Sequence, residues 1–198
     1  MTEVSRLPLF PLQTVLFPGG LLPLRVFEAR YVDLVSQCLR EGSAFGVNLI
    51  AEGKEVGAPA RPHATGTSAR IVSCDAPQPG LLQVSVIGER RYRIVDTEVG
   101  PNGLLIAQVE WLEERTPQPV PPENAILVSV LRAIMNDLGE ELFPPPQRFD
   151  DADWVGMRLA GVLPIPLRAR QALLELELPI DRLQIIRSYL AQQGLKKD

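Results

Sequence analysis

The side chains that most often act in catalysis or bind transition metals are scarce in this sequence. It holds one histidine, His63, and two cysteines, Cys38 and Cys74. His63 stands in a Gly/Pro-rich stretch, residues 52–66, with no second histidine or cysteine cluster beside it, and the spacing of the cysteines matches no metal or redox motif. These residues predict an exposed loop imidazole and two buried free thiols, and no metal site.

Phosphate-binding and nucleophilic motifs are also missing. The pattern G-x-x-x-x-G-K-[ST] does not occur, and the single Gly-Lys pair, Gly53–Lys54, is followed by Glu55, which would repel a nucleotide phosphate. A Ser–Lys dyad would have to use Lys54 or the tail lysines, Lys196 and Lys197, none of which stands in the apolar setting that activates a lysine. We therefore expect no catalytic residue, no cofactor, and no ATPase or peptidase activity.

Acidic pairs and one arginine run are the remaining polar candidates. Acidic pairs stand beside predicted element ends, where carboxylates cap helices or face water, at residues 113–114, 140–141 and 150–151. Arg90, Arg91 and Arg93 form the only dense basic run. Arg91 and Arg93 fall on one face of a predicted strand and could contact a phosphate or a carboxylate, although an ion-paired or solvated face is the commoner arrangement.

The elements that would position these residues divide into a β-rich first half and a helical second half. Short runs with alternating apolar residues predict a small barrel or sandwich, with one helix at about residues 27–41. Four prolines in residues 115–124 predict a semi-rigid linker. We therefore predict an α+β chain with a β-rich lobe over residues 1–114 and a helical bundle over residues 125–198.

Apolar spacing predicts which helix faces are buried. The helix of the first half would bury Phe27, Tyr31, Leu34, Val35 and Cys38. The first helix of the second half would end at Gly139 and bury Leu127, Val130, Leu131, Ile134 and Leu138. Acidic residues 150–153 would cap the next helix, and Pro166 and Pro179 would open two more. Gly88 predicts a bulge or corner between two strand segments.

The stretch LPLFPLQTVLFPGGLLPLRVFEARY, residues 7–31, carries no charge before Arg25. Its uncharged part reaches the lower length of a membrane helix, but its four prolines argue against one, because each internal proline removes a helical hydrogen bond. Short buried strands joined by a turn at residues 18–20 are expected instead. At the following junction we expect an ion pair or cap between Arg25 and Glu28.

Composition narrows the function classes further. The chain has 198 residues and a formal net charge of −4, which does not indicate nucleic-acid binding. Glu3 stands where the basic region of a signal peptide would lie, and prolines break the apolar run that follows. We therefore expect a cytoplasmic protein with no membrane partner.

Several phrases follow one another in an order typical of one family. They are LPLFPL at residues 7–12, FPG at 17–19, PLRVFE at 23–28, RY at 30–31, FGV at 45–47, GT at 66–67 with Ala69 and Ile71, Gly88 with Arg91, Tyr92 and Ile94, QALLE at 171–175, and RL at 182–183. In order and spacing they resemble the Lon N-terminal domain, the substrate-recognition region of ATP-dependent Lon proteases. The resemblance covers almost the whole chain.

This resemblance implies a PUA-like, β-barrel-type first lobe followed by a helical bundle, the domain type that also occurs in cereblon-like ubiquitin-ligase adaptors. The chain lacks the ATPase and peptidase parts of a Lon protease. It therefore resembles the stand-alone bacterial Lon-domain proteins, and the resemblance bears on fold more strongly than on activity.

Three functions remain open. A non-enzymatic module that binds unfolded or specific protein segments is favoured, with Leu21 and Leu22 as the candidate surface because a turn would expose them. An RNA-binding module would use the run Arg90, Arg91 and Arg93 but is disfavoured by the net charge. The third is a small-molecule site in a cleft between the two lobes. The sequence leaves the identity of the partner and the oligomeric state open.

Overall fold

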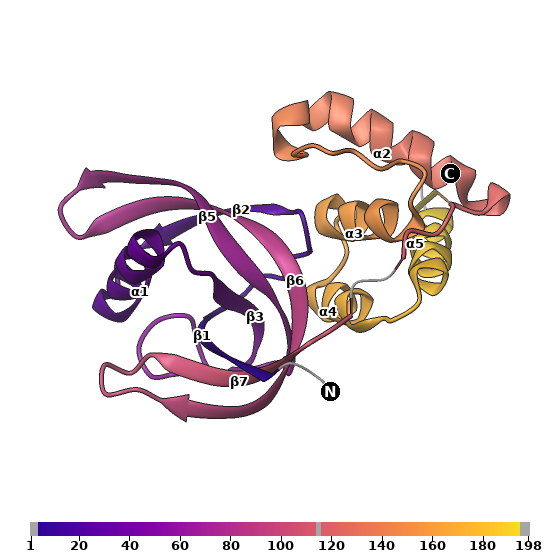
Figure 1. Cartoon of the computed structure of the whole chain (residues 1–198). Coiled ribbons are helices and arrows are strands. Elements are labelled where there is room, and N and C mark those ends of the chain that lie inside the picture. The colour runs from indigo at the N-terminus through magenta and orange to yellow at the C-terminus, as the bar shows by residue number, and fades with distance from the viewer. Residues whose placement is uncertain (1–3, 114–115, 195–198) are drawn as a thin grey trace. The chain divides into compact units, whose positions relative to one another are not determined.

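The computed structural model describes residues 4–113 and 116–194. Glu114 of the first acidic pair and the tail lysines Lys196 and Lys197 lie outside the described residues. The chain divides into two compact units, residues 1–114 and 115–198, which appear in Figure 1 as the indigo-to-pink and the orange-to-yellow parts.

The first unit is built on a sheet that closes on itself. Its strands are β1 (Val4–Leu12), β2 (Leu21–Val26), β3 (Phe45–Glu52), β4 (Arg61–Pro62), β5 (Thr65–Gln78), β6 (Leu81–Val99) and β7 (Leu105–Trp111). Strands β1, β7, β6, β5 and β3 pair in that order, and a parallel pairing of β1 with β3 closes the ring. The other pairings are antiparallel. The expected α+β fold, with a barrel-type first lobe, is confirmed.

Strand β6 organises the sheet because it changes partner near its middle. Its first half pairs with β2 and its second half with β7, while β5 follows its other edge. Gly88 lies at the change. Its N–H donates to the carbonyl oxygen of Gly20 at 2.9 Å, and a Cβ atom at this position would lie 2.3 Å from the carbonyl oxygen of Phe17. The β5–β6 register shifts beside Gly88, so the predicted bulge is confirmed.

The proline-rich N-terminal stretch lies inside this unit as strands β1 and β2, joined through a turn at Pro18–Gly19. Gly19 has a φ of 71°, a left-handed conformation that glycine adopts without strain. The expectation of short buried strands in place of a membrane helix is confirmed. No helix among the described residues is long and apolar enough to cross a membrane.

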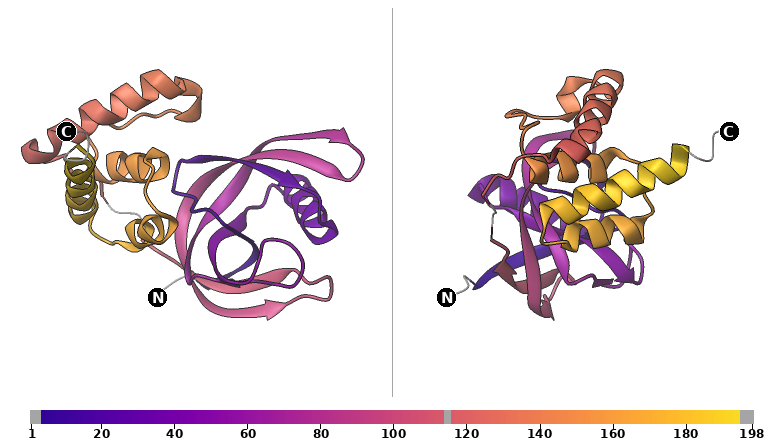
Figure 2. Two further views of the ribbon diagram at one scale, coloured as in Figure 1. Left: turned by 180° about the vertical axis from the view of Figure 1, so that it is seen from behind. Right: turned by 90° about the vertical axis from the view of Figure 1, so that its right-hand side faces the viewer.

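Helix α1 (Ala29–Glu41) lies beside the sheet, as Figure 2 shows from behind, and most of its predicted face is buried in the core that it shares with the strands. Its buried apolar residues are Tyr31, Leu34, Val35 and Cys38, and they share one core with Phe10, Phe45 and Val86. The prediction for Phe27 is wrong: its side chain is 57% exposed. The helix begins only at Ala29, after the extended N-cap Glu28, so Phe27 belongs to no helical face.

A second core fills the ring around Tyr92, which is fully buried. The Tyr92 hydroxyl donates to Oδ1 of Asn48, and Nδ2 of Asn48 donates to the carbonyl oxygen of His63 at 2.9 Å. Gly46 and Gly66 leave the space for the phenol, since a Cβ atom on either would lie within 2.6 Å of the Tyr92 hydroxyl oxygen.

The second unit is helical. Its α-helices are α2 (Ala125–Leu138), α3 (Ala152–Val162), α4 (Leu167–Glu175) and α5 (Pro179–Gly194), and its 3₁₀ helices are η1 (Pro122–Asn124) and η2 (Glu140–Leu142). Several expected ends are confirmed: α2 ends at Gly139, the Asp151 carboxylate accepts the Asp153 N–H at 3.1 Å, and Pro179 opens α5. Pro166 is the N-cap of α4 and precedes its first residue.

The buried face of α2 differs in part from the prediction. Leu127, Leu131 and Met135, spaced by four residues, are buried. Leu138 was expected on this face but is 48% exposed, because it is the last residue of the helix, where fewer neighbours can cover a side chain. Met135 was missed, although its spacing by four from Leu131 places it on the same stripe.

Candidate functional site

The structure does not bring the predicted chemistry-bearing residues together. His63 stands between β4 and β5, and its side chain is half-buried instead of exposed, because its backbone bonds to Leu49 and Asn48 on β3 hold it against the sheet. The cysteines are free, as expected, with Cys38 buried and Cys74 only half-buried. Over residues 4–113 and 116–194, no group of histidines, cysteines and carboxylates could hold a metal ion.

The acidic pairs lie at ends of elements. Asp151 caps α3 through its side chain, and Asp150 precedes it in a turn. Glu140 and Glu141 form the first turn of η2. Glu113 is exposed just beyond β7. This placement agrees with the expectation of capping and solvated carboxylates.

The arginine run lies on the second half of β6, away from the lining of the groove described below. The Arg90 guanidinium stacks on Trp111, 4.8 Å from the ring centre. Arg91 is half-buried, and the exposed Arg93 lies directly across the strand pair from Glu110. Opposite charges at such cross-strand positions attract, so part of this basic run is balanced within the first unit.

Leu21 and Leu22 do not lie in a turn. They begin strand β2 and are half-buried, because the turn before them ends at Gly20 and their backbone pairs with Ile87 and Val86 of β6. Leu22 lines a groove and packs against the α1 core. Leu21 is not part of that lining. Their role in binding stays a prediction.

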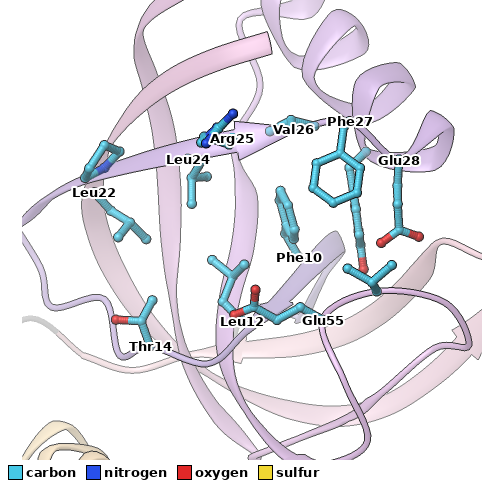
Figure 3. Close-up of a pocket in the computed structure, with 13 residues that line it drawn as sticks. Phe10, Leu12, Thr14, Leu22, Leu24, Arg25, Val26, Phe27, Glu28 and Glu55 are labelled. Atoms are coloured by element: carbon cyan, nitrogen blue, oxygen red, sulfur yellow. The ribbon is translucent and has the colours of Figure 1, made fainter. Parts of the chain in front are cut away.

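This groove, called the β2 groove below, runs along β2 and has a volume of about 330 Å³, which lies at the lower end of the range for ligand pockets. One wall is formed by residues 22–28 and the other by Leu12, Thr14 and residues 55–56, with Phe10 and Tyr31 between them. In Figure 3, Leu24 points from β2 into the groove while Thr14 and Glu55 face it from the opposite side.

The floor of the β2 groove is apolar and its rim is mixed. Phe10, Leu12, Leu24 and Tyr31 belong to the buried core beneath it. At the rim, Phe27 is 57% and Val56 55% exposed, and Arg25, Glu28 and Glu55 supply charge. Exposed apolar side chains around a hollow that is lined by apolar residues are typical of surfaces that bind another molecule.

A buried arginine, Arg30, lies next to the lining residues Glu28 and Tyr31 at the α1 end of the groove. Arg30 forms an ion pair with Glu28 at 3.0 Å and donates to the carbonyl oxygen of Gly103 at 3.0 Å. The expected ion pair between Arg25 and Glu28 is therefore wrong, because Glu28 pairs with Arg30 instead; Glu28 is the N-cap residue of α1, although its side chain makes no capping hydrogen bond. Burial raises the pKa of Tyr31, an effect that the nearby Arg30 guanidinium opposes. The phenol thus stays neutral at the groove floor.

The loop between β3 and β4 supplies the outer wall. The N–H of Gln13 donates to the Glu55 carboxylate, which ties this loop to the segment after β1. Gly53 and Gly57 have φ values of 103° and 96°, so glycine is needed on both sides of the segment that carries Glu55 and Val56. Sequence reasoning tested Gly53–Lys54 only as a phosphate loop and missed this wall. The two flanking glycines were the available signal.

The groove offers surface and shape but no reaction partners. Among the residues that the structure describes, no histidine, cysteine or lysine lines it, and the carboxylates of Glu55 and Glu28 already interact with the Gln13 N–H and with Arg30. A smaller and almost wholly apolar hollow of about 180 Å³ lies between α4 and α5 of the second unit. Both sites can hold apolar groups, and only the β2 groove combines them with a strand edge and charges.

Comparison with known proteins gives one consistent result. The profile of the family described as the ATP-dependent protease La (LON) substrate-binding domain matches residues 6–192. The crystal structure of a Lon N-terminal domain protein from Xanthomonas campestris is 38% identical, with a TM-score of 0.78 over 93% of this chain and 98% of that one. The N-terminal domain of a Mycobacterium avium complex Lon protease, 18% identical with a TM-score of 0.67, shares the fold.

Longer proteins match as well. Lon protease 2 of Myxococcus xanthus is 29% identical over 185 residues, which cover 85% of this chain and 21% of that protein. Protein cereblon of Xenopus tropicalis is 27% identical over 115 residues, 56% of this chain and 25% of that protein. The chain thus spans about a quarter or less of these relatives. By the extent of the family match and the shared fold, the chain belongs to the family of Lon substrate-binding (N-terminal) domains.

Proposed function

We propose that this protein binds extended, apolar segments of other proteins in the β2 groove and carries out no reaction on them. The observation that carries the proposal is the groove itself, with a floor of apolar core side chains and the exposed side chains of Phe27 and Val56 at its rim. Unfolded segments expose apolar side chains that such a surface can bury, at roughly 25 cal/mol per Å².

The family description supports a binding role. The matching family is named for substrate binding, and relatives that carry the domain are called Lon proteases. The match concerns the substrate-binding domain, and the 198 residues contain no Walker-type nucleotide loop. We therefore assign binding to this chain and leave ATP hydrolysis and proteolysis to the relatives. The two free cysteines fit a reducing, cytoplasmic location.

Fewer observations support the other two functions, RNA binding and a small-molecule site. The arginines proposed for RNA contacts include Arg90, which stacks on Trp111, and Arg93, which faces Glu110. A small-molecule site between the two lobes stays a prediction from the sequence. Neither has an observation comparable to the β2 groove.

The test measures binding of a fluorescein-labelled, reduced and carboxymethylated α-lactalbumin by fluorescence anisotropy. Val56→Asp places a charge at the rim of the groove, and we expect it to weaken binding by about tenfold or more, because the carboxylate loses water when the segment binds. Val95→Asp on β6 is the matched control, since Val95 is equally exposed, at 55%, and does not line the groove.

Equal affinities of the Val56→Asp and Val95→Asp variants would contradict the assignment of the groove. No saturable binding by the unchanged protein would contradict the proposed function itself. Both variants replace exposed side chains, so unfolding in urea should show midpoints close to that of the unchanged protein.

A further inference from the structure

Strand β2 has one edge without a partner. It pairs with β6 along Leu21–Val26, and within the described part of the chain no other strand pairs with it. The residues of β2 also form one wall of the β2 groove. An unpaired edge presents backbone donors and acceptors that can accept another strand.

The backbone groups on this open edge can be identified. The Gly88 N–H donates to the Gly20 carbonyl oxygen at 2.9 Å, and these residues continue the β2–β6 register. In an antiparallel ladder, hydrogen-bonded pairs alternate with pairs that are not bonded. Leu22 and Leu24 therefore bond to β6, and the backbone groups of Leu21, Pro23 and Arg25 point to the open edge.

Proline at the centre of the open edge agrees with this assignment. Pro23 has no N–H to donate, so it fits where no bond to β6 is required. The open edge thus offers the N–H groups of Leu21 and Arg25 and the carbonyl groups of Leu21, Pro23 and Arg25. The missing central donor weakens continuous pairing with a second copy of the same edge, whose central donor would also be missing.

Side chains of an added strand would alternate between two environments. Residues level with Leu22, Leu24 and Val26 would point to the groove floor, because side chains of paired strands at one level share a face. Residues level with Leu21, Pro23 and Arg25 would point to the outer face. Arg25 is exposed there and forms no ion pair with any residue in 4–113 or 116–194, so an acidic side chain across from it would be attracted.

We propose that the bound segment adds to the open edge of β2 as a further strand, with alternate apolar residues in the groove and an acidic residue across from Arg25. This inference rests on the proposed function and specifies its binding mode. The partner is thus an extended polypeptide in which apolar residues alternate with polar ones, including one carboxylate.

A designed peptide tests whether the bound segment forms backbone hydrogen bonds with the open edge of β2. The probe is a capped peptide in which four valines alternate with threonine, glutamate and threonine, with lysines at both ends for solubility. Two versions carry N-methyl groups on the two alternate sets of residues. An added strand turns only one set of its N–H groups toward β2, so we expect one version to lose about 30-fold in affinity, as for two lost hydrogen bonds, and the other to keep its affinity within about twofold.

The outcomes separate this inference from the proposed function. Equal effects of the two N-methyl sets, or no binding of the probe to a protein that binds the unfolded polypeptide, would overturn strand addition while the groove assignment could stand. Amide exchange by NMR gives an independent measurement: on binding the probe, exchange at Leu21 and Arg25 should slow at least about tenfold. Unchanged exchange at both residues would also overturn the inference.

The proposed contact between Arg25 and an acidic residue of the bound segment is tested by reversing the charge on each side in turn. Arg25→Glu should weaken binding of the glutamate probe by about fivefold and strengthen binding of a version with lysine in place of glutamate by a similar factor. Arg168→Glu in the first turn of α4 is the control variant, because Arg168 is also exposed, forms no ion pair with any described residue and does not line the groove. The same preference in all three proteins would contradict the acidic residue across from Arg25.

Discussion

Tyr92 is the residue around which the smaller core of the first unit is arranged. Its buried hydroxyl has one described partner, Oδ1 of Asn48, and burial raises its pKa well above the ordinary value of 10.0. The hydrogen bond from the hydroxyl to Asn48 opposes this rise only in part. The folded protein therefore holds this phenol in its neutral form, because a phenolate would lose its water in the closed ring.

Stability should therefore fall at alkaline pH. An unfolded tyrosine releases its proton near pH 10, whereas native Tyr92 keeps it, so the unfolded state binds fewer protons above that pH. The contribution is complete below pH 10, and the free energy of unfolding should drop by about 1.4 kcal/mol per pH unit above it, until the native phenol titrates. Urea unfolding between pH 8 and about 11, followed by Trp111 fluorescence in a Trp154→Phe background, measures the slope.

Tyr92→Phe isolates this effect from other groups, including Tyr31 and Cys38, whose pKa values burial also raises. The variant should be less stable at neutral pH, by about 1–2 kcal/mol, because Asn48 loses its donor. Its decline above pH 10 should be shallower than that of the unchanged protein. Parallel slopes would show that Tyr92 does not cause the decline.

Gly66 gives a steric test at the same site. A Cβ atom at Gly66 would lie 2.5 Å from Nδ2 of Asn48 and 2.6 Å from the Tyr92 hydroxyl oxygen, and the two side chains are held by each other. We expect Gly66→Ala to lower the free energy of unfolding by about 2–3 kcal/mol, as overpacking does. Gly194→Ala is the control, because a Cβ atom there meets nothing within 4 Å. Equal unfolding free energies for the two variants would refute the steric account.

At the scale of elements, one arginine of α5 holds the ends of two other helices. Arg182 is 0% exposed and forms an ion pair with Asp153 in the first turn of α3. It also donates to the carbonyl oxygens of Leu173 at 2.9 Å and Leu176 at 2.7 Å. These carbonyls belong to the end of α4, where intrahelical donors run out. Arg182 thus completes the C-terminal cap of α4 and anchors α3.

Arg182→Met should therefore destabilise the second unit strongly. It removes the guanidinium donor from the carbonyl oxygens of Leu173 and Leu176 and from the Asp153 carboxylate, and we expect the free energy of unfolding to fall by about 3 kcal/mol. Trp154, which stacks edge-on against Phe149, reports this unit in a Trp111→Phe background. Arg187→Met, on the same helix, is the control because that guanidinium donates to only one described acceptor, the carbonyl oxygen of Glu123. A loss no larger than the control's would contradict the capping role.

At the scale of the whole molecule, both core clusters of the first unit consist of residues from 7 to 109 and their packed neighbours up to Trp111. We predict that residues 1–114 expressed alone fold cooperatively and bind the labelled α-lactalbumin with an affinity within about threefold of the full chain. Urea unfolding by Trp111 fluorescence and the anisotropy titration check this. A fragment that folds but does not bind would place an essential part of the site outside the first unit.

Much of the fold was readable from local pattern. Proline placement excluded a membrane helix for residues 7–31, because proline affects the backbone at its own position whatever surrounds it. Gly88 predicted the bulge in β6, and Gly139, Asp151 and Pro179 marked helix ends correctly. These signals are local, and they hold without knowledge of the tertiary contacts. The order of family phrases added the closed first lobe and the helices after it.

The β2 groove was decided by tertiary structure. Its walls come from β2, from the end of β1 and from the loop after β3, which are separated in sequence and meet only when the ring closes. The open edge of β2 is also a result of the sheet pairing, because β2 lies off the closed ring and pairs with β6 alone among the described strands. Composition and spacing determine which segments are extended, helical or turned, because those preferences act over a few residues. Which edges remain unpaired depends on long-range pairing, which no local pattern contains.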